Sequence, residues 1–280
     1  MTEPASPSPR IHPRRRKSMA AKADRHELYE LSVQAPATDA ATLAKLYKKV
    51  RKRQPVSLRE DFCGTAVLSL AWVRSRPGRT AVGIDLDQPT LDWGLANRIE
   101  PVRDRVGDRL QLHCANVLDG VGPKTDVIAA LNFSYFVFQQ RSQMLEYFRA
   151  ARRKLVDDGV FILDLVGGWG SMGVETNRRK VDGFKYKWEQ RSFDPLTHHF
   201  TCAIGFEFPD GSRIDDAFFY DWRLWTSPEL RDLLYDAGFS KVHLMWERTD
   251  EDGEGTGKFY EPRKEIENEE SWWTYIVAER

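Results

Sequence analysis

The residues best suited to chemistry in this chain are two acids and a glycine around a predicted strand, turn and helix. Glu60 lies in a predicted strand that begins at Val56, Gly64 follows in the next turn, and Asp85 ends a second predicted strand that begins at Thr80. In a parallel sheet, ligands bind beyond the carboxyl ends of the strands, where glycine lets the backbone approach the ligand and a carboxylate accepts from ribose hydroxyl groups. The arrangement predicts a site for an adenosine-bearing cofactor.

The glycine pattern argues against a dinucleotide. A dinucleotide fingerprint has glycine at three alternate positions after the acid, and here those positions hold Phe62, Gly64 and Ala66. Only the middle glycine is present, so a pyrophosphate cradle is not expected.

The same residues resemble motifs of a known family. The core Cys63-Gly64-Thr65, the preceding Glu60 and the later Gly83-Ile84-Asp85 resemble the first two cofactor motifs of class I S-adenosylmethionine-dependent methyltransferases. The resemblance extends from about Pro55 to Arg280 and implies S-adenosyl-L-methionine as the cofactor. It implies that Glu60 faces the amino acid end of this cofactor, that the backbone of Phe62, Cys63, Gly64 and Thr65 approaches it, and that Asp85 binds the ribose while Leu86 packs on the adenine.

A third segment also resembles the family. The run Cys114-Ala-Asn-Val-Leu-Asp119 matches its third motif, in which an acid after the third strand usually meets the adenine amino group. The matching residue here is Asn116, and its amide carbonyl can accept the same hydrogen bond. The resemblance implies that Ala115 and Val117 line the adenine ring, and a plain loop role is the alternative for Asn116.

The predicted fourth strand ends beside an aromatic-rich run. Asn132 lies at its carboxyl edge, where family members place the transferring methyl group, so Asn132 is a candidate cofactor contact, and Asn132 and Tyr135 are candidates for positioning the substrate. Core packing is the alternative for the aromatic residues. Methyl transfer is an in-line displacement that alignment and exclusion of water can accelerate without a catalytic acid or base.

Exclusion of water requires a lid, and three segments could provide one. They are the segment that carries Tyr29, the loop Gly167-Gly168-Trp169-Gly170, and a predicted β meander that carries Tyr186, Trp188, Tyr220, Trp222 and Arg223. Their aromatic faces could stabilise a substrate cation, and hydrophobic packing is the alternative. We expect no metal site, because the histidines lack ligand spacing and partner acids.

The elements that must position these residues alternate between strand and helix. Strands are predicted over Val56–Asp61, Thr80–Asp85, Leu110–Cys114, Thr125–Leu131 and Val160–Val166, and helices over Val67–Ser75, from Pro89, and over Ser142–Leu155. A capping box at Thr226 starts another helix, followed by strands Lys241–Glu247 and Trp273–Ala278. The pattern predicts an α/β, Rossmann-like fold with parallel strands. The family resemblance implies seven strands, the last of them antiparallel.

The chain divides into three predicted parts. Residues 1–22 are rich in Pro, Ser and Arg and are predicted to form a flexible basic tail. Residues 23–54 form an N-terminal helical cap of two amphipathic helices, and residues 55–280 form the methyltransferase domain. Alternation with a period of two predicts an inserted, three-stranded antiparallel meander over residues 183–222.

Composition excludes several classes of protein. Apolar residues make up 41% and charged residues 30%, and no apolar run approaches the length of about 18 residues that a membrane span needs. Forty-two basic residues balance forty-two acidic ones, so no global field attracts nucleic acid. Three cysteines without a Cys-x-x-Cys pair, and an N-terminus without an apolar signal, favour the cytoplasm.

The leading hypothesis is a methyltransferase that acts on a small-molecule amine or hydroxyl group. The alternatives are an RNA or protein methyltransferase that uses the basic tail as an electrostatic arm, and a non-catalytic S-adenosylmethionine-binding protein. A homo-oligomer formed through the inserted meander is left open.

Overall fold

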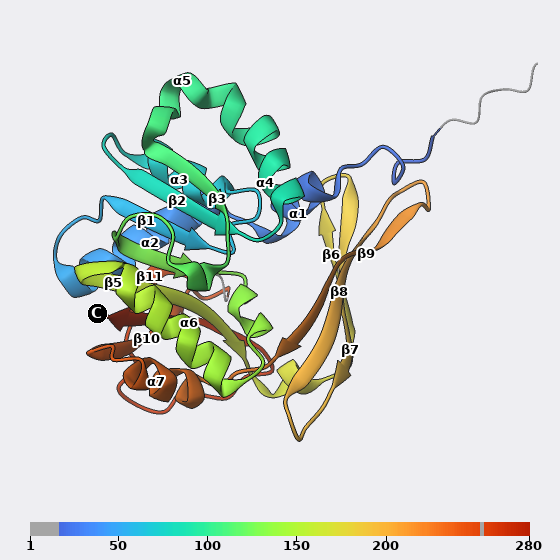
Figure 1. Ribbon diagram of the computed structural model, residues 1–280. Helices are drawn as coiled ribbons and strands as arrows, with labels where there is room; N and C mark the ends of the chain where they lie inside the picture. The colour runs from blue at the N-terminus through green and yellow to red at the C-terminus, as the bar shows by residue number, and fades with distance from the viewer. Residues whose placement is uncertain (1–16, 253–254) are drawn as a thin grey trace, which may run out of the picture.

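The computed structural model describes residues 17–252 and 255–280, which form two sheets (Figure 1). An eight-stranded sheet with helices on both faces is the main body, and a four-stranded antiparallel sheet lies beside it. The first helix, α1 (Arg25–Val33), packs against the smaller sheet through Leu28. No helix of the described chain is long and apolar enough to cross a membrane.

The main sheet has the strand order β11-β10-β12-β5-β4-β1-β2-β3. The parallel strands are β1 (Ser57–Asp61), β2 (Thr80–Asp85), β3 (Leu110–Cys114), β4 (Thr125–Ala130) and β5 (Leu155–Gly167). Strand β12 (Trp272–Glu279) runs antiparallel between β5 and β10 (Lys241–Thr249). The predicted α/β fold with an antiparallel last strand is confirmed, and β11 (Gly255–Tyr260) adds an eighth strand at the edge.

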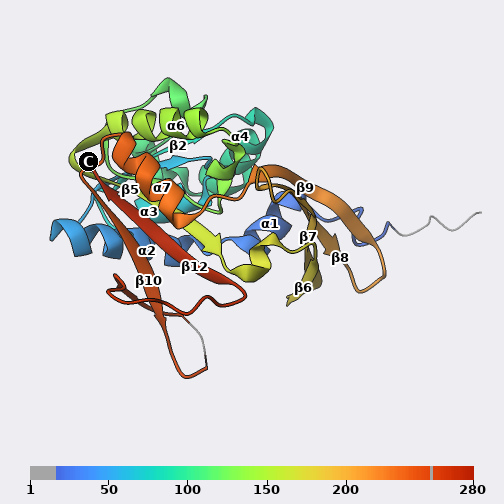
Figure 2. The ribbon, with the colours of Figure 1, turned by 90° about the horizontal axis from the view of Figure 1, so that it is seen from below.

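Helices cover both faces of this sheet. Ile128 and Phe161 face the core under α6 (Arg141–Lys154) and α7 (Ser227–Asp236), whereas Val127 and Ile162 face the core under α2 (Pro36–Arg51) and α3 (Val67–Ser75). Figure 2 shows α6 and α7 on one side of the strands and α2 on the other. Because both faces are buried at the centre of the sheet, β4 is apolar over Val127–Ala130 and β5 over Val160–Leu163.

The smaller sheet is the predicted meander with one more strand. It consists of β6 (Thr176–Val181), β7 (Phe184–Phe193), β8 (His199–Glu207) and β9 (Arg213–Arg223) in consecutive order. The sequence analysis missed β6, because five of its six side chains are exposed and its charged sequence shows no alternation. Phe200, Cys202 and Trp222 belong to the core under α6, so the meander is part of the main hydrophobic structure.

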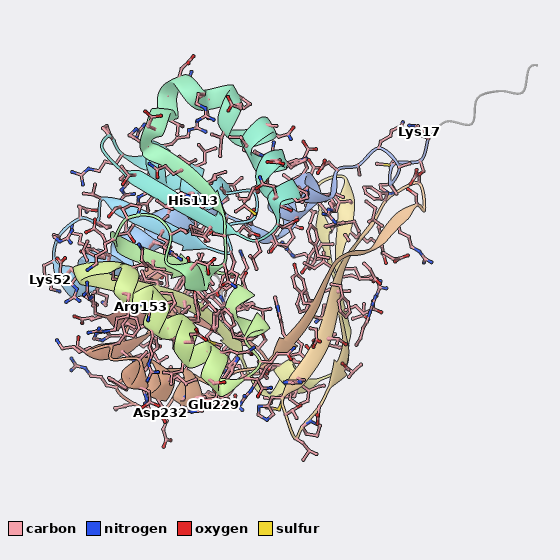
Figure 3. All side chains as sticks on the ribbon, viewed as in Figure 1. Lys17, Lys52, His113, Arg153, Glu229 and Asp232 are labelled. Atoms are coloured by element: carbon pink, nitrogen blue, oxygen red, sulfur yellow. The ribbon has the colours of Figure 1, made fainter. Side chains whose placement is uncertain are left out.

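The N-terminal region is tied to this meander. Residues 1–16 of the predicted flexible tail lie outside the described residues. The backbone N–H groups of Met19 and Ala20 donate to the side chains of Asp210 (2.8 Å) and Ser212 (3.0 Å), which precede β9. Lys17 lies beside the same turn, far from Lys52 and Arg153 on the main body (Figure 3). The last residues of the predicted tail are therefore fixed to the meander.

Two short helices link β2 to β3, and the first contacts the turn that follows β1. Helix α4 (Gln88–Gly94) continues into a π-helical turn, Leu95–Ile99, and α5 (Arg103–Val106) follows. A Cβ atom added to Gly94 would lie 2.8 Å from the carbonyl carbon of Thr65. The missing side chain therefore lets α4 approach the backbone of the predicted cofactor turn.

We predict that Gly94→Ala destabilises the protein by about 1–3 kcal/mol, because Thr65 backbone atoms would have to move. At an open helical position the same change stabilises by roughly 0.5–1 kcal/mol, so the sign is diagnostic. Urea unfolding measures it, with Lys49→Ala on the exposed face of α2 as the control. A stability gain for Gly94→Ala would show that α4 does not press on this turn.

Candidate functional site

The turn after β1 has a left-handed backbone at three alternate residues. Phe62, Gly64 and Ala66 have φ angles of 59°, 54° and 59°. Side chains disfavour this conformation, so packing must hold the first and third residues in place. The Phe62 ring packs edge-on against Phe138 and Tyr147 at 6.0 and 5.7 Å. The turn thus has a glycine-like backbone at all three positions where a dinucleotide fingerprint has glycine, although only Gly64 is a glycine.

Asp85 links the ends of β1 and β2. One carboxylate oxygen accepts from the N–H group of Gly64 at 2.8 Å and the other accepts from the N–H group of Asp87 at 2.9 Å. The neighbouring Leu86 side chain is 67% exposed at the edge of the site. A carboxylate has about four acceptor directions, so Asp85 is held in place and can still accept from a ligand.

Glu60 is a buried acid next to this turn. One of its oxygens accepts from the N–H group (2.8 Å) and the hydroxyl group (2.6 Å) of Ser69 on α3. Burial, together with repulsion by the carboxylates of Asp39 and Asp85, raises the pKa of Glu60 to about 8. The two hydrogen bonds from Ser69 act to lower it. A bound cation would favour the ionised form of Glu60.

The side chains of the predicted turn residues beside Gly64 are engaged in contacts within the protein. Cys63 is buried, and its Sγ atom would lie 2.8 Å from a Cβ added to Gly83. The hydroxyl group of Thr65 donates to Glu30 of α1 at 2.6 Å, and Glu30 also forms a 2.7 Å ion pair with Arg98. These contacts fasten α1 to the turn.

The loop after β3 carries the three residues that were predicted to lie near the adenine. Ala115 and Asn116 are half-buried, and Oδ1 of Asn116 already accepts from the N–H group of Leu118 at 3.0 Å. Val117 is only 4% exposed and belongs to the core under α6. Its side chain therefore does not line an adenine ring, contrary to the prediction.

The sequence analysis missed Arg59, a side chain of β1 that is 1% exposed. Its guanidinium forms a 2.6 Å ion pair with Asp61 and donates to the carbonyl oxygens of Val117 and Val121, both at 2.9 Å. Tyr147 donates to the other oxygen of Asp61 at 3.1 Å. Arg59 thereby joins the strand before the cofactor turn to the loop on the predicted adenine side. A charge inside a buried strand was the available signal, because such a charge needs partners.

Asp164 shapes the loop after β4. Asn132 and Phe133 both have a φ angle of 56°, and their N–H groups donate to the two oxygens of Asp164 at 2.6 and 3.1 Å. Burial raises the pKa of Asp164 to about 7, although these two hydrogen bonds act to lower it. Two successive left-handed residues therefore depend on one buried carboxylate at the end of β5.

The structure contradicts the prediction that Tyr135 positions the substrate. Its side chain is completely buried, and its hydroxyl group donates to the carbonyl oxygen of Asp164 at 2.7 Å. The ring packs at right angles on Phe136. Tyr135 therefore supports the loop from the core and does not reach a substrate.

A cavity of about 790 Å³ lies between the two sheets. Asn132 and Phe133 line it from the main sheet, and the predicted residues Tyr29, Tyr186, Trp188, Tyr220 and Trp222 line it from α1 and the meander. Tyr29 and Tyr220 are hydrogen-bonded to each other, and burial raises the pKa of Tyr29 to about 12, so its hydroxyl group is neutral near pH 7. The predicted lid segments thus line one common space.

Arg223 does not face this cavity, contrary to the prediction. Side chains alternate along β9, so Tyr220 and Trp222 point inward and Arg223 points to the other face. Its guanidinium pairs with Glu229 at 2.8 Å and lies 3.8 Å from the ring centroid of Trp225.

Three acids that the sequence analysis did not single out also line the cavity: Glu175, Glu269 and Glu270. Among the described lining residues there is no lysine, arginine or histidine. The segment with Glu269 and Glu270 packs against the predicted Gly-rich lid loop, where Gly170 donates to the carbonyl oxygen of Glu270 at 2.9 Å. A Cβ on Gly168 would lie 2.7 Å from the carbonyl oxygen of Glu269. The clustered glycines were the available signal for this close approach.

No family model matches the sequence, and no curated protein matches it. Solved structures match it along nearly its whole length. An S-adenosylmethionine-dependent methyltransferase from Clostridium acetobutylicum superposes with a TM-score of 0.65 at 16% identity, over 91% of this chain and 96% of that one. The chain has the class I S-adenosylmethionine-dependent methyltransferase fold.

Two further structures share this methyltransferase fold. CalS10, an amino pentose methyltransferase from Micromonospora echinaspora, was solved with S-adenosylmethionine bound, and it matches with a TM-score of 0.62 at 15% identity over 91% and 95% of the two chains. The sugar N-methyltransferase KedS8 from Streptoalloteichus matches with a TM-score of 0.60 at 16% identity over 100% and 99%.

We predict that Arg59→Met lowers the free energy of unfolding by about 3–5 kcal/mol, because Asp61 becomes a buried charge without its partner. The double variant with Asp61→Leu should recover part of this loss. Chemical denaturation measures both. Equal stability of Arg59→Met and the unaltered protein would contradict the role of the ion pair.

We predict a pH-dependent contribution of Asp164 to stability. Its pKa is raised from 3.8 to about 7 on folding, so its stabilising effect is complete below about pH 4 and is lost as the pH rises to about 7. In that window the unfolding free energy should fall by up to roughly 1.4 kcal/mol per pH unit. Asp164→Asn should make the measured slope less steep by this amount, whereas the contribution of Glu60 remains, and the exposed control Asp157→Asn should leave the slope unchanged. Parallel urea-unfolding profiles for all three proteins would exclude the effect.

Proposed function

We propose that the protein is an S-adenosylmethionine-dependent methyltransferase that methylates an amine group of a small molecule. The observation that carries the proposal is the cavity at the end of β4, where Asn132 and Phe133 meet aromatic and acidic walls. Helix α1 and the meander cover part of this cavity, and closure around a substrate would align the reacting groups and reduce contact with water.

The edge of the main sheet fits the cofactor. S-adenosylmethionine, when bound, supplies a methyl group on a positively charged sulfur atom. Asp85 would accept from the ribose hydroxyl groups, Gly64 would allow close approach of the backbone, and Glu60 would face the amino group. Asn132 would lie at the junction between this edge and the cavity.

The cavity favours an amine over a hydroxyl acceptor. Three acidic residues and no basic one are among the described lining residues, so the negative charge around the cavity would attract an ammonium group, and aromatic faces stabilise the same charge. Trp188 stacks on Tyr220 at 6.3 Å, and Tyr220 lies 4.3 Å from Trp222, so a continuous aromatic wall forms one side. A neutral hydroxyl group gains little from so many acids.

A carboxylate could also accept the proton that an ammonium group must lose before N-methylation. An ammonium acceptor must first lose a proton so that its lone pair can form the new N–C bond while the C–S bond breaks toward sulfur. Glu175, whose Oε1 accepts from the side chain of Asn177 at 2.7 Å, is a candidate acceptor for that proton. A group already at the cavity wall can serve as a general base.

The fold neighbours agree with this choice of acceptor. One is described as an amino pentose methyltransferase and another as a sugar N-methyltransferase. Their identity to this chain is low, so they support an amine as the class of acceptor and leave its carbon skeleton to experiment.

The test is release of S-adenosylhomocysteine with pairs of small molecules that differ only in an amine or a hydroxyl group. We expect turnover with amines, and a rise in KM of about tenfold for Glu269→Gln or Glu270→Gln, equivalent to about 1.4 kcal/mol. Glu267→Gln is the matched control, because it lies in the same segment and does not line the cavity.

The other outcomes decide between the alternatives. Turnover with hydroxyl compounds only would overturn the amine assignment. Tight S-adenosylmethionine binding that Asp85→Ala weakens, without turnover of any small molecule, would favour the non-catalytic hypothesis. Transfer to RNA or protein that requires residues 1–22 would favour the macromolecular hypothesis.

A further inference from the structure

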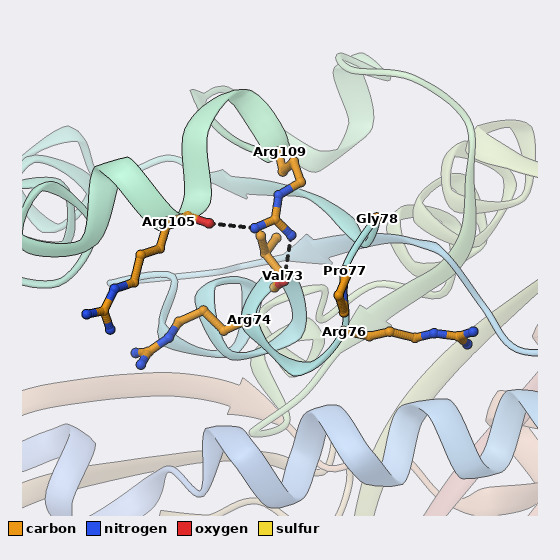
Figure 4. Close-up of a pocket in the computed structure, with 7 residues that line it drawn as sticks. All are labelled: Val73, Arg74, Arg76, Pro77, Gly78, Arg105 and Arg109. Atoms are coloured by element: carbon orange, nitrogen blue, oxygen red, sulfur yellow. Dashed lines mark hydrogen bonds between the residues drawn. The ribbon is translucent and has the colours of Figure 1, made fainter.

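A second cavity, of about 450 Å³, lies at the opposite edge of the main sheet, where β2 and β3 begin. Four arginines line it, Arg74, Arg76, Arg105 and Arg109, and the other described lining residues are uncharged (Figure 4). Methyl transfer at the far edge makes no use of it.

Arg109 has a structural role in this cavity. Its guanidinium donates to the carbonyl oxygens of Val73 (2.8 Å), Arg79 (3.3 Å) and Arg105 (2.6 Å). These bonds satisfy a carbonyl group at the end of α3 and hold the neighbouring loops together. The base of the cavity is therefore rigid and positively charged.

Arg74 and Arg105 are not explained in this way. Figure 4 shows their side chains extending in the same direction from α3 and α5. Within the described chain, neither guanidinium has a carboxylate within ion-pair distance, including the nearby Asp104 and Asp108. Arg98, by contrast, forms a 2.7 Å ion pair with Glu30. Arg74 and Arg105 both line the cavity, so both would attract an anion that is bound there.

A buried neighbour adds to the positive charge. Arg79 is largely buried, stacks on Trp72 at 3.9 Å, and donates to the hydroxyl group of Ser75 at 2.6 Å. Its Nε atom has no hydrogen-bond partner, and burial together with the charge of Arg76 lowers its pKa. This corner of the described structure thus holds five arginines and no paired acid.

We propose that this cavity binds the phosphate or pyrophosphate group of a small molecule, with Arg74 and Arg105 as the charged donors. Guanidinium groups donate paired hydrogen bonds to phosphate oxygens, and a pyrophosphate has enough oxygens for both arginines. The volume lies within the range of small-molecule sites.

The site is separate from the cofactor edge. Helix α3 has nine residues and runs from the turn after β1 to this cavity, a length of about 13 Å at 1.5 Å per residue. A phosphate group bound here would leave Asp85 and Gly64 free for the cofactor. The two ligands should therefore occupy their separate sites at the same time.

Isothermal titration of the full chain with pyrophosphate, in the presence of saturating S-adenosylmethionine and at low ionic strength, tests the proposal. We expect one site per chain, weakened at least about tenfold by Arg74→Gln or by Arg105→Gln. Arg231→Gln is the matched control, because it removes the same charge from α7, outside the cavity. It should change the affinity less than about threefold.

Parallel titrations with ATP and adenosine distinguish the sources of the phosphate. ATP binding that depends on Arg74 would identify the ligand as a nucleotide. Binding of pyrophosphate without binding of ATP would identify it as the free anion. Adenosine, which has no phosphate group, should not bind in this cavity. The proposal fails if pyrophosphate does not bind, if Arg231→Gln weakens its binding as much as Arg74→Gln and Arg105→Gln do, or if S-adenosylmethionine competes with it. Tighter binding of an oligonucleotide than of pyrophosphate would replace it with a nucleic-acid surface.

Discussion

Carboxylates that bind backbone N–H groups are the interaction on which the site depends. Sharp turns at strand ends leave N–H groups without helix or sheet partners, and such groups are costly to bury. Here acids satisfy them: Asp85 accepts from Gly64 and Asp87, Asp164 from Asn132 and Phe133, Glu60 from Ser69, and Asp126 from Val56 and Ser57. Charged acceptors form strong bonds, so side chains other than glycine can occupy left-handed positions in these turns.

The same acids set the charge of the sheet edge. Asp61 and Asp126 are paired with Arg59 and Arg53. Asp85, Glu60 and Asp164 form no ion pair with any described residue. Burial raises the pKa values of Glu60 and Asp164, and the charge of Asp85 contributes to the shift of Glu60. S-adenosylmethionine carries positive charge on its sulfur and its amino group, so its binding at this edge would favour the ionised forms of these acids.

Local pattern predicted the elements well and non-local contacts poorly. The bounds of Val67–Ser75, Thr80–Asp85 and Leu110–Cys114 agree to the residue, because apolar runs end at clear breakers such as Pro77-Gly78. The edge strands β6 and β11 were missed because their polar residues carry no periodicity. Arg59 finds its carbonyl partners 58 and 62 residues away, and the directions of Tyr135 and Arg223 depend on which face their neighbours bury, so no local signal reports them.

The net charge of the protein does not describe the local charge at its two cavities. The balance of 42 basic and 42 acidic residues correctly describes a chain without a long-range field, yet acids line the cavity at one edge of the main sheet and arginines line the cavity at the other. Strand β2 has six residues, about 20 Å in length, and this exceeds the screening length of about 8 Å at physiological salt. The two edges therefore act on ligands independently, and a neutral sequence can hold one site for a cation and another for an anion.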